Sequence, residues 1–273
     1  MKIFVLGPQG TFCDEAANIY TEKRNIMSEK IFCEDIDSIF ENIKNSETYG
    51  IVPIENTLAG HVHKTLDNLM TRNVTVIDEI YVPVKFSLLS NVKNKDDIKS
   101  IFVQFKTKEE CTSAIKQFRN ARIIMTESNM QSFHSLFDSE KGCAAIVPQR
   151  LYDENNENFK IKDVTDSDNN TTRFFVTAPK FEIQISDTLK RDFKASLYVL
   201  DADNKPGMLF NILKEFSEKQ INLISIMSKP TKKEMGKYNF FIELSGNKGE
   251  YEKITETLDR LSKKYRLKLL GVY

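Results

Sequence analysis

The chain has 273 residues, of which 40% are hydrophobic and 29% charged, a composition typical of a globular protein long enough for two domains. Basic and acidic side chains both number 39, so charge gives no support for binding to nucleic acid or to an anionic membrane. No apolar run reaches the ~20 residues that span a bilayer. The four cysteines are scattered without paired spacing, which predicts reduced thiols and a cytoplasmic protein.

Short strands and amphipathic helices alternate over the first part of the chain. Residues 2–6 alternate in hydropathy and predict a first strand rather than a signal peptide. A Gly-Pro-Gln-Gly turn follows, and Thr11 is suited to cap the next helix. The remaining pattern predicts a helix at 36–43, a buried strand at 49–52, a helix near 62–69 and a strand-rich stretch at 74–89 that crosses between lobes at Pro83.

The next part of the chain predicts a second α/β lobe and then a return to the first. Strands are expected at 101–103, 121–125, 143–147, 159–165 and 172–177, with helices at 107–118 and 129–138. Alternating strands and helices favour mostly parallel sheets with helices on both faces. We therefore expect a first domain at residues 1–180, in which about 1–80 with 166–180 form one lobe and 81–165 form the other, with a cleft between them.

The pattern changes after a charged stretch at 181–192, which is the expected linker. Alternating apolar positions predict strands at 195–199, 221–227, 238–244 and 265–272, and helical spacing predicts helices at 208–216 and 251–261. This order is βαββαβ, the split unit of ferredoxin-like domains. Residues 193–273 are therefore expected to form a second domain.

Three polar segments lie where predicted strands of the first domain meet loops. They are GPQGTF at 7–12, VPIENTLAG at 52–60 and NNTTRFFV at 169–176. A glycine turn that opens a helix presents free backbone N–H groups to an anion. Each segment alone also fits a plain turn, a helix cap or a strand with a polar start. Together they are poor in acids and rich in amides and hydroxyls, which suits an anionic substrate because a lining carboxylate would repel it.

Other kinds of catalytic site find no support in the sequence. No Ser–His–Asp or Cys–His arrangement and no carboxylate pair stands out near the three segments. His61 and His63 are two residues apart, whereas a pair of metal ligands on a helix needs i, i+4 spacing. No metal site is therefore predicted.

The three segments in this order, followed by the second domain, resemble the prephenate dehydratase family over essentially the whole chain. The second domain resembles an ACT domain, which binds amino acids. The resemblance implies a periplasmic-binding-protein-like catalytic domain and the conversion of prephenate to phenylpyruvate, with loss of carbon dioxide and water, for L-phenylalanine biosynthesis. It also implies no cofactor, L-phenylalanine as an allosteric effector, and a homodimer or homotetramer. Because the chain opens on its first strand, a monofunctional enzyme without a chorismate-mutase segment is expected.

The resemblance also assigns roles to individual residues. The family's essential threonine falls on Thr172, whose hydroxyl would donate to the departing ring hydroxyl. The implied substrate-binding residues are Gly10, Thr11, Asn56, Thr57, Thr171, Arg173 and Phe174. The implied effector-binding residues are Asn204, Pro206, Gly207, Met208, Leu209, Asn222, Leu223 and Ser228. The sequence leaves open whether Arg173 pairs with a substrate carboxylate or is structural, and Phe174 fits packing better than reaction.

The chain departs from the family's pattern between Ile101 and Cys111. The family's serine aligns with Val103, and its active-site glutamine aligns with Glu110. An ionised Glu110 facing a dianionic substrate would be unfavourable, so it is expected to point away, to pair with a nearby lysine or to be protonated. Arogenate carries an ammonium group that a carboxylate could meet, so arogenate dehydratase is one alternative.

The presumed effector motif departs as well. Met227 and Lys229 stand where the family usually has Glu and Arg. We therefore expect an effector to be held mainly by backbone groups, at an interface between paired ACT domains. A catalytically impaired amino-acid sensor is the other alternative to the enzyme.

Overall fold

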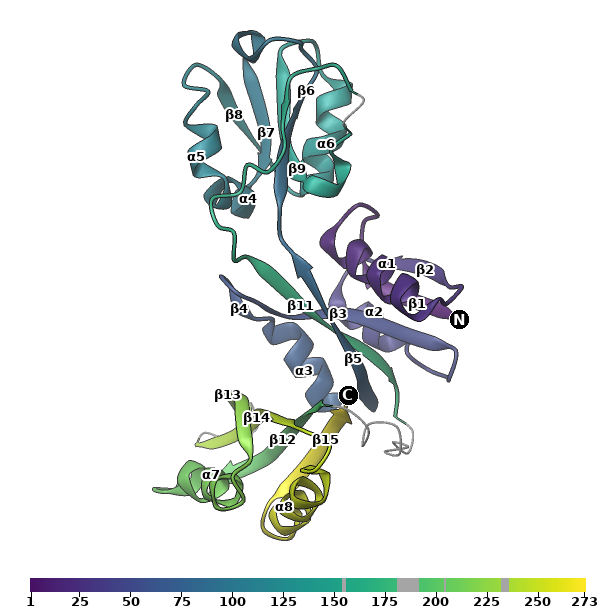
Figure 1. The fold of residues 1–273 in the computed structure, drawn as a ribbon, viewed down its shortest axis with the longest axis vertical. Helices are drawn as coiled ribbons and strands as arrows, with labels where there is room; N and C mark the ends of the chain where they lie inside the picture. The colour runs from purple at the N-terminus through teal and green to yellow at the C-terminus, as the bar shows by residue number, and fades with distance from the viewer. Residues whose placement is uncertain (154–155, 181–191, 204, 232–235) are drawn as a thin grey trace.

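The computed structural model describes residues 1–153, 156–180, 192–203, 205–231 and 236–273. Its strands form three sheets that follow one another along the long axis of the molecule, one in each lobe and one in the C-terminal part (Figure 1). The fold is therefore mixed α/β, as predicted. Within the described ranges, no helix is long and apolar enough to cross a membrane.

The sheet of the first lobe has the strand order β2-β1-β3-β11-β5, with β4 paired to β3. Its strands are β1 (Lys2–Leu6), β2 (Glu29–Cys33), β3 (Thr48–Asn56), β4 (Gly60–His61), β5 (Val74–Pro83) and β11 (Thr171–Pro179). Three helices cover it: α1 (Phe12–Arg24), α2 (Ile36–Asn42) and α3 (His63–Thr71). Helix α1 packs on one face of the sheet, and α2 and α3 pack on the other. β11 is antiparallel to both of its neighbours, so the sheet is mixed rather than wholly parallel.

The second lobe lies at the far end of the molecule and is joined to the first by two crossings of the chain, before β6 and before β11 (Figure 1). Its sheet has the order β10-β6-β9-β7-β8. The strands are β6 (Phe86–Ser90), β7 (Ser100–Gln104), β8 (Arg122–Thr126), β9 (Cys143–Pro148) and β10 (Lys160–Ile161). The helices are α4 (Phe105–Glu110), α5 (Thr112–Ile115) and α6 (Asn129–Asp138), with short 3₁₀ turns η1 (Lys95–Asp97) and η2 (Gln149–Leu151).

The helix expected at 107–118 is broken at Cys111. Asp166 accepts hydrogen bonds from the backbone N–H groups of Thr112 and Ser113, at 2.7 and 3.0 Å, and so caps a new helix there. The strand expected at 159–165 is also shorter, since only Lys160–Ile161 pairs with β6. The break at Cys111 thus arises from a contact between segments far apart in the sequence.

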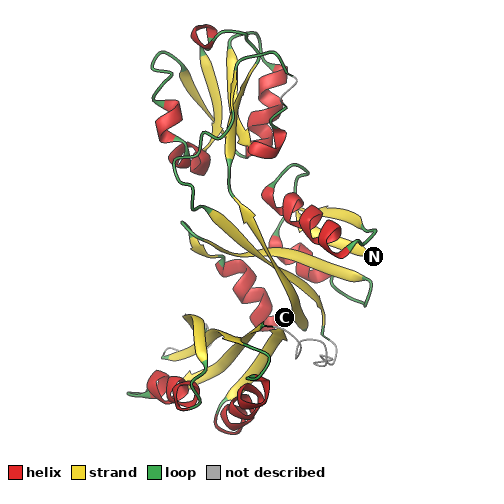
Figure 2. Ribbon diagram, in the orientation of Figure 1, coloured by secondary structure: helices red, strands yellow, loops and turns green. Residues whose placement is uncertain are grey.

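The C-terminal part has the predicted βαββαβ order. Its elements are β12 (Phe193–Asp203), α7 (Met208–Glu218), β13 (Asn222–Pro230), β14 (Lys237–Gly246), α8 (Tyr251–Lys264) and β15 (Arg266–Val272), with sheet order β13-β14-β12-β15. Both helices lie on one face of the sheet, and the other face meets the first lobe (Figure 2). The linker expected at 181–192 lies outside the described residues except for its last position.

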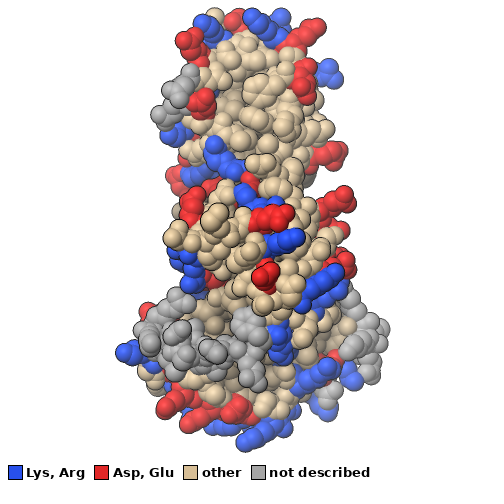
Figure 3. All heavy atoms as spheres, turned by 90° about the vertical axis from the view of Figure 1, so that its right-hand side faces the viewer, with Lys and Arg blue, Asp and Glu red and all other residues tan. Residues whose placement is uncertain are grey.

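The contact between the C-terminal sheet and the first lobe includes a shared apolar core. Tyr198, Phe241 and Tyr273 of the C-terminal sheet share one buried cluster with Phe175 of β11. The approach is closest at Gly271, where a Cβ atom would lie 2.0 Å from the carbonyl oxygen of Val76. Only glycine fits there. On the face shown in Figure 3, positive and negative side chains intermingle, in keeping with the balanced composition.

Candidate functional site

Strand β11 carries two neighbouring residues that serve different parts of the molecule. Successive side chains of a strand point to opposite faces of its sheet. Thr172 pairs in register with Asn56 of β3 and lines the cleft between the two lobes. Arg173 pairs with Glu55 and lines a separate cavity at the C-terminal domain.

The cleft between the lobes has a volume of about 560 Å³. Its first-lobe lining includes Gly7, Pro8, Thr11, Asn56, His61 and Thr172. Its second-lobe lining includes Gln104, Lys106, Glu110, Glu127, Ser128 and Asn129. Polar groups thus converge from both lobes on a space large enough for a small organic acid.

The side-chain amide of Asn56 has a fixed orientation. Its Oδ1 accepts hydrogen bonds from the backbone N–H groups of Leu58 and Ala59, at 3.0 and 2.9 Å. Its Nδ2 therefore faces the other way and donates to Thr172 Oγ1 at 3.0 Å and to Asn170 Oδ1 at 2.7 Å. Because the Thr172 oxygen already accepts a hydrogen bond, the hydroxyl proton remains available to a molecule in the cleft.

Glu110 faces the cleft rather than pointing away from it. Its Oε2 accepts a hydrogen bond from Nδ2 of Asn170, at 3.0 Å, and Asn170 itself is buried. Loss of water around the carboxylate raises the pKa of Glu110, and the bond from Asn170 and the charge of Lys106 offset only part of that rise. Glu110 therefore does not point away from the cleft, its hydrogen-bond partner is an amide rather than a lysine, and the raised pKa favours the protonated form that the sequence also allowed.

Gly10 and Thr11 of the glycine turn make hydrogen bonds to other groups of the protein. Thr11 caps α1, as expected, by accepting from the backbone N–H of Asp14 at 3.4 Å. The N–H of Gly10 donates to Asp14 Oδ2 at 2.9 Å, and its carbonyl accepts from Arg150 of the second lobe at 3.2 Å. Gly10 is buried with φ +97°, and a Cβ atom would lie 2.4 Å from Met130 Sδ. Its backbone N–H is thus not free to hold a substrate carboxylate in this conformation.

Besides Gly10, four of the expected substrate contacts do not line the cleft. Thr57 and Thr171 bond to each other, with Thr57 Oγ1 donating to the Thr171 carbonyl at 2.9 Å and accepting from its N–H at 2.7 Å. They line the cavity at the C-terminal domain together with Arg173. Phe174 is 1% exposed and packs in the core beneath α1. The structure therefore brings together Thr11, Asn56 and Thr172, and adds Asn170 and Glu110, which the list of expected site residues lacks.

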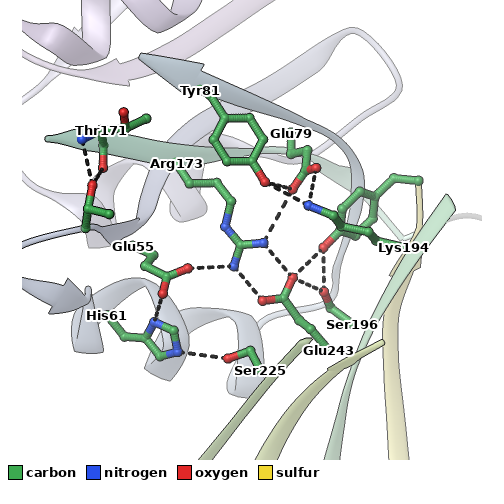
Figure 4. A network of polar contacts seen from close by, with 12 residues as sticks. Glu55, His61, Glu79, Tyr81, Thr171, Arg173, Lys194, Ser196, Ser225 and Glu243 are labelled. Atoms are coloured by element: carbon green, nitrogen blue, oxygen red, sulfur yellow. Dashed lines mark hydrogen bonds and ion pairs between the residues drawn. The ribbon is translucent and has the colours of Figure 1, made fainter. Parts of the chain in front are cut away.

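Arg173 is the centre of an ion-pair network between domains (Figure 4). Its guanidinium forms a two-fold pair with Glu243 of β14, at 3.0 and 2.5 Å, and lies 3.2 Å from Glu55 and 3.4 Å from Glu79. Burial disfavours the charged guanidinium, but the bonds and charge of Glu243 outweigh this and raise the pKa of Arg173. The sequence left open whether Arg173 meets substrate or is structural, and here it joins two domains.

Other polar contacts extend this network on both sides. Glu243 is fully buried and also accepts from Ser196 Oγ at 3.1 Å and from the Tyr273 hydroxyl at 2.9 Å. Lys194 donates to Glu79 at 2.6 Å, and His61 Nε2 lies 3.1 Å from Ser225 Oγ of β13 (Figure 4). Arg173, which follows Thr172 in the chain, is therefore held directly by the C-terminal domain, and Glu55, which precedes Asn56, is connected to that domain through Arg173.

The expected effector residues lie at two ends of the C-terminal sheet. Gly207 has φ 80° and opens α7, with Pro206, Met208 and Leu209 around it. Asn222 starts β13 at the opposite end of the sheet, beside Ser245, to which it donates at 3.1 Å. Leu223 follows Asn222, Ser228 lies near the end of β13, and Asn204 lies outside the described residues. One chain alone does not bring the Gly207 turn and Asn222 together.

Lys229 lies in the presumed effector motif, but its side chain contacts the first lobe. Its side chain is buried and donates to the carbonyl of His63 at 3.1 Å, and it pairs with Asp67 of α3. The cation thus attaches β13 to the first lobe.

Comparison with known proteins agrees with this architecture. The family model described as "Prephenate dehydratase" matches residues 3–181, and the ACT domain model matches residues 196–262. A prephenate dehydratase of Methanocaldococcus jannaschii is 29% identical over 97% of this chain and 95% of its own length. An arogenate dehydratase/prephenate dehydratase of Arabidopsis thaliana is 27% identical over 85% of this chain and 60% of its own length. A prephenate dehydratase from Arthrobacter aurescens, whose crystal structure was solved in complex with L-Phe, is 25% identical in sequence. The match covers 100% of this chain and 90% of the Arthrobacter chain, with a TM-score of 0.84.

Proposed function

The chain belongs to the prephenate dehydratase family and is a dehydratase with a C-terminal ACT domain, and we propose that prephenate reacts in the cleft between its two lobes. The reaction takes the prephenate dianion and one proton to phenylpyruvate, carbon dioxide and water. The bond from the ring to its carboxylate breaks, its electron pair completes the aromatic ring, and the ring C–O bond breaks as hydroxide leaves. The leaving hydroxide needs a proton or a strong hydrogen-bond donor, because it is a poor leaving group.

Thr172 supplies that donor in our proposal. The observation that carries it is the bond from Asn56 Nδ2 to Thr172 Oγ1, which leaves the hydroxyl proton for the substrate. A threonine hydroxyl is a weak acid, so it donates a hydrogen bond to the leaving oxygen, and solvent is the final source of the proton. A positioned donor of this kind contributes about 10²–10⁴-fold in rate.

We assign regulation by L-phenylalanine to the ACT domain. The ACT match and the L-Phe complex of the Arthrobacter relative support this. The separation of Gly207 from Asn222 supports an effector site completed by a second copy of the chain, and hence a homodimer or homotetramer. The Arg173–Glu243 pair offers a route from that site to Thr172, and a coupling free energy of about 1–3 kcal/mol is typical of such regulation. The free cysteines support a cytoplasmic location.

Arogenate is the second candidate substrate, and one observation favours it. Two carboxylates, Glu110 and Glu127, line the cleft against one lysine, Lys106. A dianion such as prephenate is repelled by them, whereas the ammonium group of arogenate would be attracted. The Arabidopsis relative carries both activities in its name.

A direct assay separates these candidates. The purified chain is incubated with prephenate or with arogenate, and phenylpyruvate and L-phenylalanine are quantified by chromatography. Phenylpyruvate from prephenate is the expected result. L-Phenylalanine from arogenate alone would support the second candidate, and no product from either substrate would refute the proposed site chemistry.

A further inference from the structure

Asn170 is a buried amide that connects the two lobes next to Thr172. It lies just before β11, donates to Glu110 of α4 in the second lobe, and accepts from Asn56 of β3 in the first lobe. We propose that Asn170 and Glu110 are positioning residues, which hold the Asn56 amide so that the Thr172 hydroxyl proton points into the cleft. This inference rests on the donor role proposed for Thr172.

The hydrogen bonds fix the orientation of the side-chain amides of Asn56 and Asn170. The Asn56 oxygen is occupied by two backbone N–H groups, so its NH₂ must face Asn170 and Thr172. The Asn170 oxygen must then face Asn56, and the Asn170 NH₂ must face Glu110. The group at position 110 therefore has to accept a hydrogen bond. An ionised carboxylate meets this requirement with either oxygen, because it has no proton to donate.

The backbone around both residues is held firmly. The carbonyl of Asn170 accepts from the N–H of Val84 at 2.8 Å, and the carbonyl of Glu110 accepts from the N–H of Asp166 at 2.8 Å. Asn170 is 1% exposed, so loss of its partner would leave a buried NH₂ group without a hydrogen bond. Asn56 would then be free to shift away from Thr172.

Glu110 also gives the proposal a pH signature. Burial raises the pKa of Glu110, so protonation begins at a higher pH than for an exposed glutamate. The protonated carboxyl is a weaker acceptor and can itself donate, which disturbs the orientation of Asn170. The other charged or titratable groups around Glu110 and the cleft include His61, Lys106, Glu109, Cys111, Glu127 and Asp166.

The test measures kcat and KM for prephenate between mildly acidic and neutral pH in five full-length variants. Glu110→Leu and Asn170→Leu remove the acceptor and the connecting amide, and each should lower kcat about ten-fold, with little change in KM for Asn170→Leu. Glu110→Gln keeps an acceptor without a titrating proton, so it should retain kcat and lose the decline at acid pH. Glu109→Gln changes the neighbouring exposed carboxylate and should match wild type. Thr172→Val reports the donor role independently, and circular dichroism confirms folding of each variant.

The outcomes distinguish this inference from the function on which it rests. If wild type is active and Thr172→Val is not, but Glu110→Leu keeps the wild-type kcat and pH profile, the positioning inference alone is refuted. A loss in Glu110→Gln equal to that in Glu110→Leu would also refute it, because an acceptor would not suffice. If Asn170→Leu fails to fold, the comparison of the two Glu110 variants still decides. If wild type turns over no prephenate, the proposed function itself fails.

Discussion

Replacing Arg173 by methionine should weaken the attachment of the C-terminal domain to the first lobe. The substitution keeps most of the apolar side chain but removes the cation that pairs with Glu243. Both side chains are nearly inaccessible, with 7% exposure for Arg173 and 0% for Glu243. A carboxylate would thus remain buried without its counter-charge.

The size of the effect follows from this burial. Removal of one partner of a buried ion pair typically costs about 3–5 kcal/mol of stability. Ser196 and Tyr273 still donate to Glu243 and lessen the penalty. We therefore expect a loss of about 3 kcal/mol in the free energy of unfolding, at the lower end of that range.

Urea unfolding followed by far-UV circular dichroism measures this loss, since the chain has 0 tryptophans to report by fluorescence. A double-mutant cycle with Glu243→Gln should give a coupling of about 1–3 kcal/mol between the two residues. Arg24→Met is the matched control, because its pair with Asp78 is 40% exposed on the arginine side and should be worth at most about 1 kcal/mol. If Arg173→Met unfolds within about 1 kcal/mol of wild type, the interdomain ion pair does not hold the domains as described.

Two further predictions concern Glu110 and the effector. Burial raises the folded-state pKa of Glu110 above its ordinary value of 4.5, so its ionised form costs stability above that pH. Glu110→Gln should accordingly raise the midpoint of urea unfolding at neutral pH. This gain in stability should disappear as the pH falls below the ordinary pKa of glutamate. An unchanged midpoint at pH 7 would contradict the raised pKa of Glu110. L-Phenylalanine should give measurable heat by calorimetry with wild type and at least about ten-fold weaker binding with Gly207→Val, since φ 80° disfavours valine. Absence of heat with wild type would refute the effector assignment.

Hydropathy patterns within short windows of the sequence correctly predicted those strands and helices whose formation depends on neighbouring residues. The βαββαβ order of the C-terminal domain follows from its period-2 and helical spacing and is confirmed. The break at Cys111 was not predicted, because its cause is Asp166, more than fifty residues further along the chain. Periodicity in a short window carries no information about such a partner.

Residues of the candidate site could be predicted only where residue type and the alternation of side chains along a strand are enough to place them. Asn170 and Thr172 are two apart on an extended segment and share a face, a signal that could have added Asn170 to the site. The same alternation places Arg173 on the other face. Glu243 was not anticipated, since it lies on the face of β14 opposite Phe240, Ile242 and Leu244, and a glutamate on that face would ordinarily be solvent-exposed. The first lobe covers that face instead.

The most direct test of the central claim compares prephenate turnover by wild type, Thr172→Val and Thr172→Ser. Valine keeps the shape of threonine but has no hydroxyl, whereas serine keeps the donor. We predict that Thr172→Val loses about 10²–10⁴-fold in kcat and that Thr172→Ser retains most of it. If Thr172→Val forms phenylpyruvate at nearly the wild-type rate, Thr172 is not the donor to the leaving oxygen.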